Sequence, residues 1–178
     1  PEGLQRKLRA KLQGVSEAEL ILKEAVPYEV QAVFLIHNLS GLIMVDIQQS
    51  DLDTEIEPID ADMLAGMLTA IRSFASDCMS RNVDNSELDA INYSGSKIIL
   101  EVAGYCYLAV IIQGEPDAAF IAKVRRIFAK TVQTYGDRFK EFDGDMDTIP
   151  AEVCTWLQPL VDIETKTGKK SSSRNLLL

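Results

Sequence analysis

The order of the expected helices and strands is the sequence feature that most constrains how this chain can fold. Two apolar strands, 30–38 and 41–48, are separated by a tight turn and followed by a long amphipathic helix. Three further strands and a second long helix come after them. Because the turns between neighbouring strands are short, we expect antiparallel pairing. The order α-β-β-α-β-β-β-α-α therefore predicts a two-layer α/β fold of the α+β class, with a five-stranded antiparallel sheet.

The first strand is apolar on both of its faces. The run from Val30 to His37 has the composition of a strand buried on two sides, so we expect it to be a central strand. Asn38 and Gly41 supply the positive φ angles that the hairpin turn needs. His37, the only histidine of the chain, is expected to end the strand and to form a hydrogen bond in the turn. A role as a base or a pH switch is the alternative.

The first long helix, at about residues 60–78, carries a wide apolar stripe. Asp60 is expected to cap its N-terminus, and Asp62 complements its dipole. The apolar residues fall at helical spacing in two ridges: Met63, Leu64, Met67, Leu68, Ile71, Phe74, Ala75 and Cys78. The other face is small or polar: Ala65, Gly66, Thr69, Ser73 and Ser76. Either the helix is simply well buried, or one apolar ridge packs on the core and the other meets a partner.

The second half of the sequence predicts a three-stranded meander and a closing helix. The strands are expected at residues 88–93, 97–102 and 105–113. The helix is expected to start at Gly114–Pro116, with the proline in its first turn, and to run to about Phe142. We expect four segments in the chain: an N-terminal helical arm (1–27), the main domain (28–143), a C-terminal helix (144–163) and a basic flexible tail (164–178).

Charge and composition limit the classes of partner. The net charge is −9, and the two ends of the chain are basic while the body between them is acidic. An acidic body disfavours nucleic acid and favours a partner with a basic face. The basic ends could meet an anionic membrane surface or an acidic subunit. The longest apolar run is Tyr105–Ile112, which is too short to span a bilayer. No secretory signal is recognisable, and the start at Pro1 rather than Met indicates either a trimmed chain or a segment of something longer.

Three cysteines, Cys78, Cys106 and Cys154, are expected to be small buried apolar side chains rather than redox pairs or nucleophiles. This usage fits a reducing compartment, so we expect a cytoplasmic protein.

Asp143, Asp145 and Asp147 have the alternate spacing that opens a calcium loop, but the glycine and glutamate that the EF-hand pattern requires further on are missing. No phosphate loop and no pairing of a nucleophile with a base is recognisable. The sequence predicts no catalytic residue, no metal, no cofactor and no enzymatic activity.

Three segments carry a resemblance to a known family. They are Ala32–Asn38 with Gly41–Ile43, Asp60–Ile71, and Phe139–Asp145. With the element order, they resemble the roadblock/longin superfamily, which has a profilin-like fold. They are also similar to a cytoplasmic segment of some cyanobacterial proteins that carry a peptidoglycan-binding domain of the outer-membrane-protein-A type. The resemblance covers roughly residues 28–143.

The resemblance implies a non-enzymatic adaptor or scaffold. Roadblock-like domains typically dimerise and act as platforms for Ras-like GTPases or for assemblies on membranes. In the common dimer, the edge strand after the first long helix pairs with its copy, and the two helices pack together. Carried over to this chain, the interface residues are Met63, Met67, Phe74, Leu88, Ala90 and Asn92. The implied partners are a second copy of the chain and another protein, such as a small GTPase or a subunit of a membrane-associated complex.

A small-molecule sensor is the alternative from a different class. Related folds hold ligands between sheet and helix, and such a site needs polar groups that point inward. Apart from Asn92 and Glu101, the expected strands are too apolar to suggest such a site. A closed, dry core favours the scaffold, whereas a large cavity favours the sensor.

Overall fold

The structure, a computed structural model, describes residues 3–5, 28–49, 57–79 and 89–162. The chain divides into two compact units, one of which is Tyr28–Ile163 and is described here by itself. The predicted N-terminal arm and basic tail lie outside the described residues, apart from a short helical stretch at residues 3–5. Leu88 also lies outside them.

Five strands form one antiparallel sheet, as the sequence predicted. In chain order they are β1 (Glu29–His37), β2 (Ile43–Gln48), β3 (Ala90–Tyr93), β4 (Ser96–Ala103) and β5 (Cys106–Gln113). In space their order is β2-β1-β5-β4-β3, and every neighbouring pair is antiparallel. The β1–β2 hairpin and the β3–β4–β5 meander therefore meet where β1 pairs with β5, and β2 and β3 form the two edges. The predicted α+β class and the five-stranded antiparallel sheet are confirmed.

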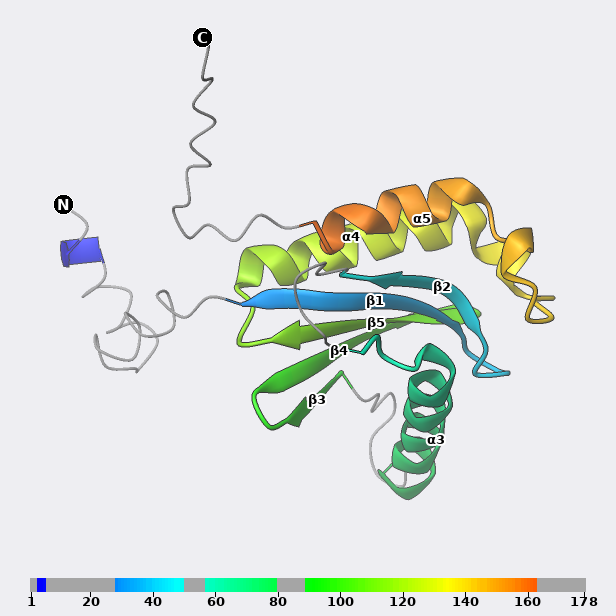
Figure 1. Ribbon diagram of the computed structural model, residues 1–178, viewed down its shortest axis with the longest axis horizontal. Helices are drawn as coiled ribbons and strands as arrows, with labels where there is room; N and C mark the ends of the chain where they lie inside the picture. The colour runs from blue at the N-terminus through cyan, green and yellow to red at the C-terminus, as the bar shows by residue number, and fades with distance from the viewer. Residues whose placement is uncertain (1–2, 6–27, 50–56, 80–88, 163–178) are drawn as a thin grey trace, which may run out of the picture. The chain divides into compact units, whose positions relative to one another are not determined.

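Helices cover both faces of the sheet. The first helix, α3 (Ala61–Met79), lies on one face, and α4 (Ala118–Tyr135) and α5 (Ala151–Leu157) lie on the other (Figure 1). Three short 3-10 helices complete this unit: η1 (Gly136–Phe139), η2 (Met146–Thr148) and η3 (Gln158–Leu160). The sheet separates two apolar cores, and β1 contributes side chains to both. The fold therefore has three layers rather than the predicted two, because both faces of the central strands are apolar and each needs a helical cover.

The alternation of β1 explains its apolar sequence. Val33 and Leu35 point into the core under α4 and α5, while Phe34 and Ile36 point into the core under α3. All four side chains are fully buried. Because successive side chains of a strand face opposite sides, a strand buried on both sides must be apolar throughout. The prediction that this strand is buried on both faces is therefore confirmed.

The turn between β1 and β2 differs in one detail from the prediction. Gly41 has a φ angle of +71°, as expected, but Asn38 is not among the residues with positive φ. The Asn38 N–H donates to the Tyr105 carbonyl, at 2.8 Å, and so continues the bonding of β1 to its neighbour. The reversal takes place after Asn38, and the N–H of Gly41 closes it on the His37 carbonyl.

The bounds of α4 were predicted wrongly at both ends. The helix begins at Ala118, because the Asp117 side chain caps it by accepting the Phe120 N–H at 2.8 Å. Pro116 precedes this cap and stands outside the helix. At the other end, the α-helix stops at Tyr135 and the chain tightens into η1, which buries Phe139. The apolar spacing continued through this change of helix type and suggested one longer helix.

The last helix shares the core beneath α4. Val153, Leu157 and Leu160 are fully buried in the same cluster as β1, β2 and α4. On the outside, the Tyr135 and Trp156 rings lie 5.4 Å apart, and Lys130 stands over the Trp156 ring. The boundary proposed at residue 143 stays a prediction, although α5 and η3 pack as parts of the unit that contains the sheet.

Candidate protein-interaction surface

Few buried residues hold α3 against the sheet. Ala65 and Leu68 are the α3 side chains that are fully buried. The Thr69 hydroxyl lies 2.7 Å from the Tyr107 hydroxyl, which in turn donates to the Ala65 carbonyl at 3.3 Å. At the N-terminus, Asp60 accepts the Met63 N–H at 3.0 Å, so the predicted cap is confirmed.

A polar network fixes α3 to the β1–β2 turn. Arg72 donates to the Asn38 side chain at 2.8 Å, and its guanidinium lies 4.4 Å from the centre of the Tyr107 ring. Burial raises the pKa of Tyr107, so its hydroxyl keeps its proton for the bond to α3. A Cβ atom on Gly41 would stand 3.0 Å from the Thr69 hydroxyl oxygen. The turn therefore approaches α3 as closely as a glycine allows.

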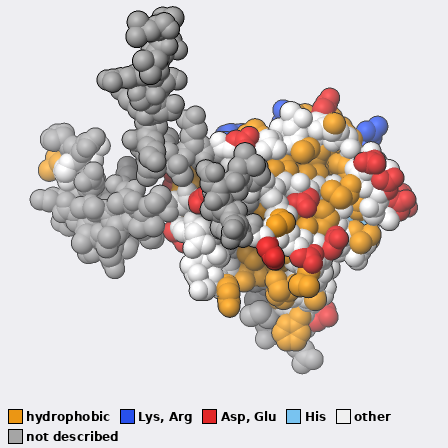
Figure 2. All heavy atoms as spheres, viewed as in Figure 1, with side chains coloured by type: hydrophobic (Ala, Val, Ile, Leu, Met, Phe, Trp, Pro, Cys, Tyr) orange, Lys and Arg blue, Asp and Glu red, His pale blue; other side chains and the backbone are white. Residues whose placement is uncertain are grey.

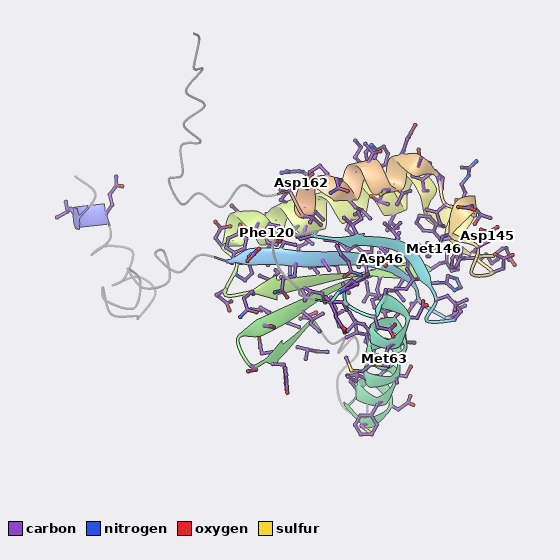
Figure 3. The ribbon with its side chains drawn as sticks, in the orientation of Figure 1. Asp46, Met63, Phe120, Asp145, Met146 and Asp162 are labelled. Carbon is purple, nitrogen blue, oxygen red and sulfur yellow. The ribbon has the colours of Figure 1, made fainter. Side chains whose placement is uncertain are left out.

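Leu64 is partly buried against the core, but four other large apolar side chains of α3 are exposed. Met63, Met67, Ile71 and Phe74 recur at i, i+4, i+8 and i+11, which places them along one side of the helix. We call these four residues the α3 stripe. Met63 is 73% exposed and Phe74 is 69% exposed. Figure 2 shows hydrophobic side chains gathered at the end of the molecule that α3 occupies in Figure 1, and Figure 3 marks Met63 on this helix. Exposed apolar residues that adjoin one another in this way are typical of an interaction site.

These exposures separate the two interpretations of α3. A helix that is simply well buried would not leave Met63 and Phe74 in solvent, so that interpretation is wrong. The assignment of faces also needs correction, because Ala65 and Thr69 were placed on the face away from the sheet. They lie against it, since a helix that packs closely on a sheet needs small side chains at the contact. The predicted interface residues Met63, Met67 and Phe74 all lie on the exposed stripe.

The edge strand β3 exposes part of its backbone at the outer edge of the sheet. The Leu100 N–H donates to the Asp89 carbonyl at 2.8 Å, which makes residues 89 and 100 a hydrogen-bonded pair. Bonded and non-bonded pairs alternate along an antiparallel ladder. In the register of β3 with β4, the N–H and C=O groups of Ala90 and Asn92 therefore point away from β4, toward the outer edge of the sheet. Ala90 and Asn92, which are both among the predicted interface residues, are therefore the β3 residues whose backbone groups can pair with another strand.

Tyr93 is a surface residue that the sequence reasoning missed. It is 79% exposed, and it lies on the same face of β3 as Ile91, which packs against the core under α3. The two-residue period of a strand would have placed Tyr93 and Ile91 together on this face. Ile71 was placed in the apolar stripe but was not among the predicted interface residues.

The cysteines do not all behave as predicted. Cys106 is buried, and burial raises its pKa to about 12. Cys78 and Cys154 are exposed, so the expectation of three buried thiols was wrong for these two. Cys78 lies in the second half of α3, where most side chains face solvent, and Cys154 lies on the outer side of α5.

Within the part of the chain that the structure describes, no three His, Cys, Asp or Glu side chains are grouped so that they could hold a metal ion. Over the same residues, no helix is long and apolar enough to cross a membrane.

The acidic turn at residues 143–147, which has the spacing of a calcium loop, is stabilised by its own backbone N–H groups. The Asp143 side chain accepts the Asp145 N–H, and the Asp145 side chain accepts the Asp147 N–H. His37 ends β1 and its Nδ1 lies 2.7 Å from the Ser40 hydroxyl, as predicted for a residue of the turn.

Comparison with known proteins gives a likeness of fold. No family in a scan of protein families matches the chain, and no curated protein matches it. Among solved structures, the chain is similar to a Roadblock/LC7 domain from Streptomyces avermitilis, with 21% sequence identity and a TM-score of 0.48. The match covers 64% of this chain and 90% of that one. From β1 to α5, the element order on which the sequence-based resemblance rested is present in the structure, so the predicted α+β fold with a five-stranded antiparallel sheet is confirmed. The similarity to a segment of cyanobacterial proteins stays a prediction.

Proposed function

We propose that this domain is a non-enzymatic protein-interaction module, an adaptor or scaffold, that acts as a homodimer. The observation that carries the proposal is the α3 stripe, a row of exposed apolar side chains on a helix that the core holds by one side only. Methionines at such a surface adapt to a partner at little cost, because their side chains are flexible and polarisable.

The stripe and the edge strand together suit a second copy of the chain. A twofold axis brings identical surfaces face to face, so each surface must complement itself. The stripe is uncharged, and it can therefore meet its own copy without charge repulsion. The outward backbone groups of Ala90 and Asn92 can pair with the same groups of another β3, which extends the sheet. A stable interface needs about 800 Å² from each partner, more than one short strand supplies, so both elements are required.

The mass in solution tests the dimer directly. Static light scattering at high micromolar concentration should give twice the mass of the chain, and dilution should lower it toward that of one chain. A mass of one chain throughout this range would refute the homodimer.

The labelling of the native cysteines gives a second, site-specific prediction. Cys78 lies on α3 near Phe74, so dimer formation should slow its reaction with a maleimide at least several-fold as concentration rises. Cys154, which is exposed on α5, is the internal control and should react at a constant rate. Cys106 should stay unlabelled in the folded protein, because it is buried and its thiolate is disfavoured. Equal protection of Cys78 and Cys154 would mean that the copies associate elsewhere.

The class of the further partner is part of the proposal. The resemblance implies a small Ras-like GTPase or a subunit of a membrane-associated assembly. We further propose, from the cysteine usage and the charge of the sequence, that the protein acts in the cytoplasm and that the basic ends of the chain can contact an anionic membrane surface. Purified Ras-like GTPases of the native host, each loaded with GDP or a GTP analogue, can be titrated against the dimer. Binding that depends on the nucleotide would support this partner class, and binding of neither form would count against it.

A further inference from the structure

A second group of exposed apolar side chains lies at one end of the sheet and includes no residue of the α3 stripe or the β3 edge. It consists of Leu39 and Leu42, in the β1–β2 turn, and Met146, at the start of η2, and we call it the turn patch. Leu39 is 81% exposed, Leu42 41% and Met146 44%. A Cβ atom on Gly144 would lie 3.2 Å from Leu42 Cδ1, so the turn and the loop before η2 touch. Figure 3 shows Met146 at the same end of the molecule as the β1–β2 turn of Figure 1.

The turn that presents these leucines is held on both sides. The Ser40 hydroxyl lies 2.7 Å from His37 Nδ1 and accepts the Leu42 N–H at 3.3 Å. The His37 ring lies 5.8 Å from the Phe142 ring on one side, and on the other side Arg72 bonds to Asn38. Leu39 is thus an exposed apolar side chain on a fixed turn. A fixed surface loses little conformational freedom when a partner binds, and this favours affinity.

Carboxylates border the turn patch. Residues 141–147 contain Glu141, Asp143, Asp145 and Asp147, and no basic residue. The three aspartates are exposed, although one carboxylate oxygen of Asp143 and one of Asp145 each accept a hydrogen bond from a backbone N–H of the loop. Arg138 and Lys140 precede this run, in and just after η1. An apolar centre with an acidic border repels phosphate, whether of a nucleic acid or of an anionic lipid, and attracts Lys and Arg side chains.

We propose that the turn patch is a second docking site, which binds a basic amphipathic helix of a partner protein. Apolar side chains on one face of that helix cover Leu39, Leu42 and Met146. Lysines or arginines beside them reach the carboxylates of Asp143, Asp145 and Asp147. This arrangement, an apolar centre with a charged border, is how amphipathic helices commonly bind. The site does not depend on the homodimer, because it uses neither the α3 stripe nor the β3 edge.

The test is a titration of the full chain with a synthetic helical peptide of about 18 residues, with leucines on one face and lysines on the other. We expect saturable binding, with one peptide for each chain, that weakens at least tenfold when the salt is raised from about 0.1 M to about 1 M, because the Debye length falls from about 10 Å to about 3 Å. The same peptide with glutamates in place of lysines should not bind. Absence of binding by the lysine peptide at the lower salt concentration would overturn the proposal.

Variants locate the site. The triple substitution Asp143→Asn, Asp145→Asn and Asp147→Asn removes three charges but keeps side-chain oxygens for the loop, and we expect it to weaken binding roughly tenfold. Leu39→Ser should weaken binding by a similar factor without loss of stability, because the side chain is exposed.

The matched control removes three charges at the opposite end of the sheet, through Glu29→Gln, Glu115→Gln and Asp162→Asn. These residues lie at the start of β1, after the end of β5 and after η3, where Figure 3 labels Asp162 far from Asp145. The control should change peptide affinity less than twofold, and Phe74→Glu should leave it unchanged. If the control triple weakens binding as much as the turn-patch triple, the peptide responds to net charge alone and the proposal is wrong. An unchanged affinity in Leu39→Ser would also overturn it.

Discussion

Replacing Phe74 by glutamate is expected to abolish self-association and to leave the fold intact. Phe74 is 69% exposed in the single chain, so the substitution should change the free energy of unfolding by no more than about 0.5 kcal/mol. In the proposed dimer the same side chain lies between two copies of α3. A central aromatic residue of an interface contributes about 2–4 kcal/mol to binding, which corresponds to about 30- to 1,000-fold in Kd.

The symmetry of the dimer makes this effect larger. Each dimer would contain the substitution twice, and two carboxylates would approach each other across the axis. We therefore expect the Kd to rise at least about 100-fold, which light scattering would show as a single-chain mass at concentrations where the unaltered protein is a dimer. The protection of Cys78 from maleimide should be lost in the same variant.

Met146→Glu is the matched control for Phe74→Glu. It also places a carboxylate on an exposed apolar position, but in η2, at a distance from the α3 stripe. It should leave the mass unchanged. If both variants dissociate the dimer to the same extent, added negative charge rather than the α3 stripe explains the effect. If Phe74→Glu stays a dimer, the interface lies elsewhere on the molecule.

The sheet could be predicted from the sequence because its signals are local. The run of β1 is apolar on both faces, and Gly95 and Gly104 mark turns where the φ angles are positive. These features give the hairpins and hence the antiparallel sheet. The end of α4 could not be predicted in the same way, because Phe139 continues the apolar spacing while the backbone has already changed to a 3-10 helix. Periodicity reports which side chains are buried and does not report the type of helix.

The candidate surface was predicted in its main residues but not in its geometry. Apolar spacing identified Met63, Met67 and Phe74, yet it gave no means to decide that Ala65 and Thr69, rather than larger residues, meet the sheet. That choice depends on how closely α3 approaches Tyr107, which is a tertiary property. The outward direction of the Ala90 and Asn92 backbone depends on the register between β3 and β4. The Ser94–Gly95 turn sets this register, and a shift by one residue would have reversed it.

Leu68→Ala is expected to be the most destabilising single substitution in α3. Leu68 is fully buried in the core between α3 and the sheet, and removal of a buried leucine side chain costs about 3–5 kcal/mol. Between residues 61 and 78 of α3, Ala65 and Leu68 are the fully buried residues, so the substitution should weaken the attachment of the helix to the sheet. Urea denaturation should show the loss as a lower midpoint, and hydrogen exchange should rise across residues 61–79 more than in β5.

Its neighbour Met67 provides the control, because it belongs to the same helix and is exposed where Leu68 is buried. Met67→Ala removes a side chain of similar size from the exposed stripe, so it should change the free energy of unfolding by less than about 0.5 kcal/mol. It should instead weaken the dimer, whereas Leu68→Ala should weaken the fold. Equal losses of stability in the two variants would mean that Met67 is buried, and the division of α3 into an anchored side and a binding side would then be wrong. Because the two residues are adjacent in the chain, helix propensity and position along the helix differ little between them, and the comparison isolates the direction in which each side chain points.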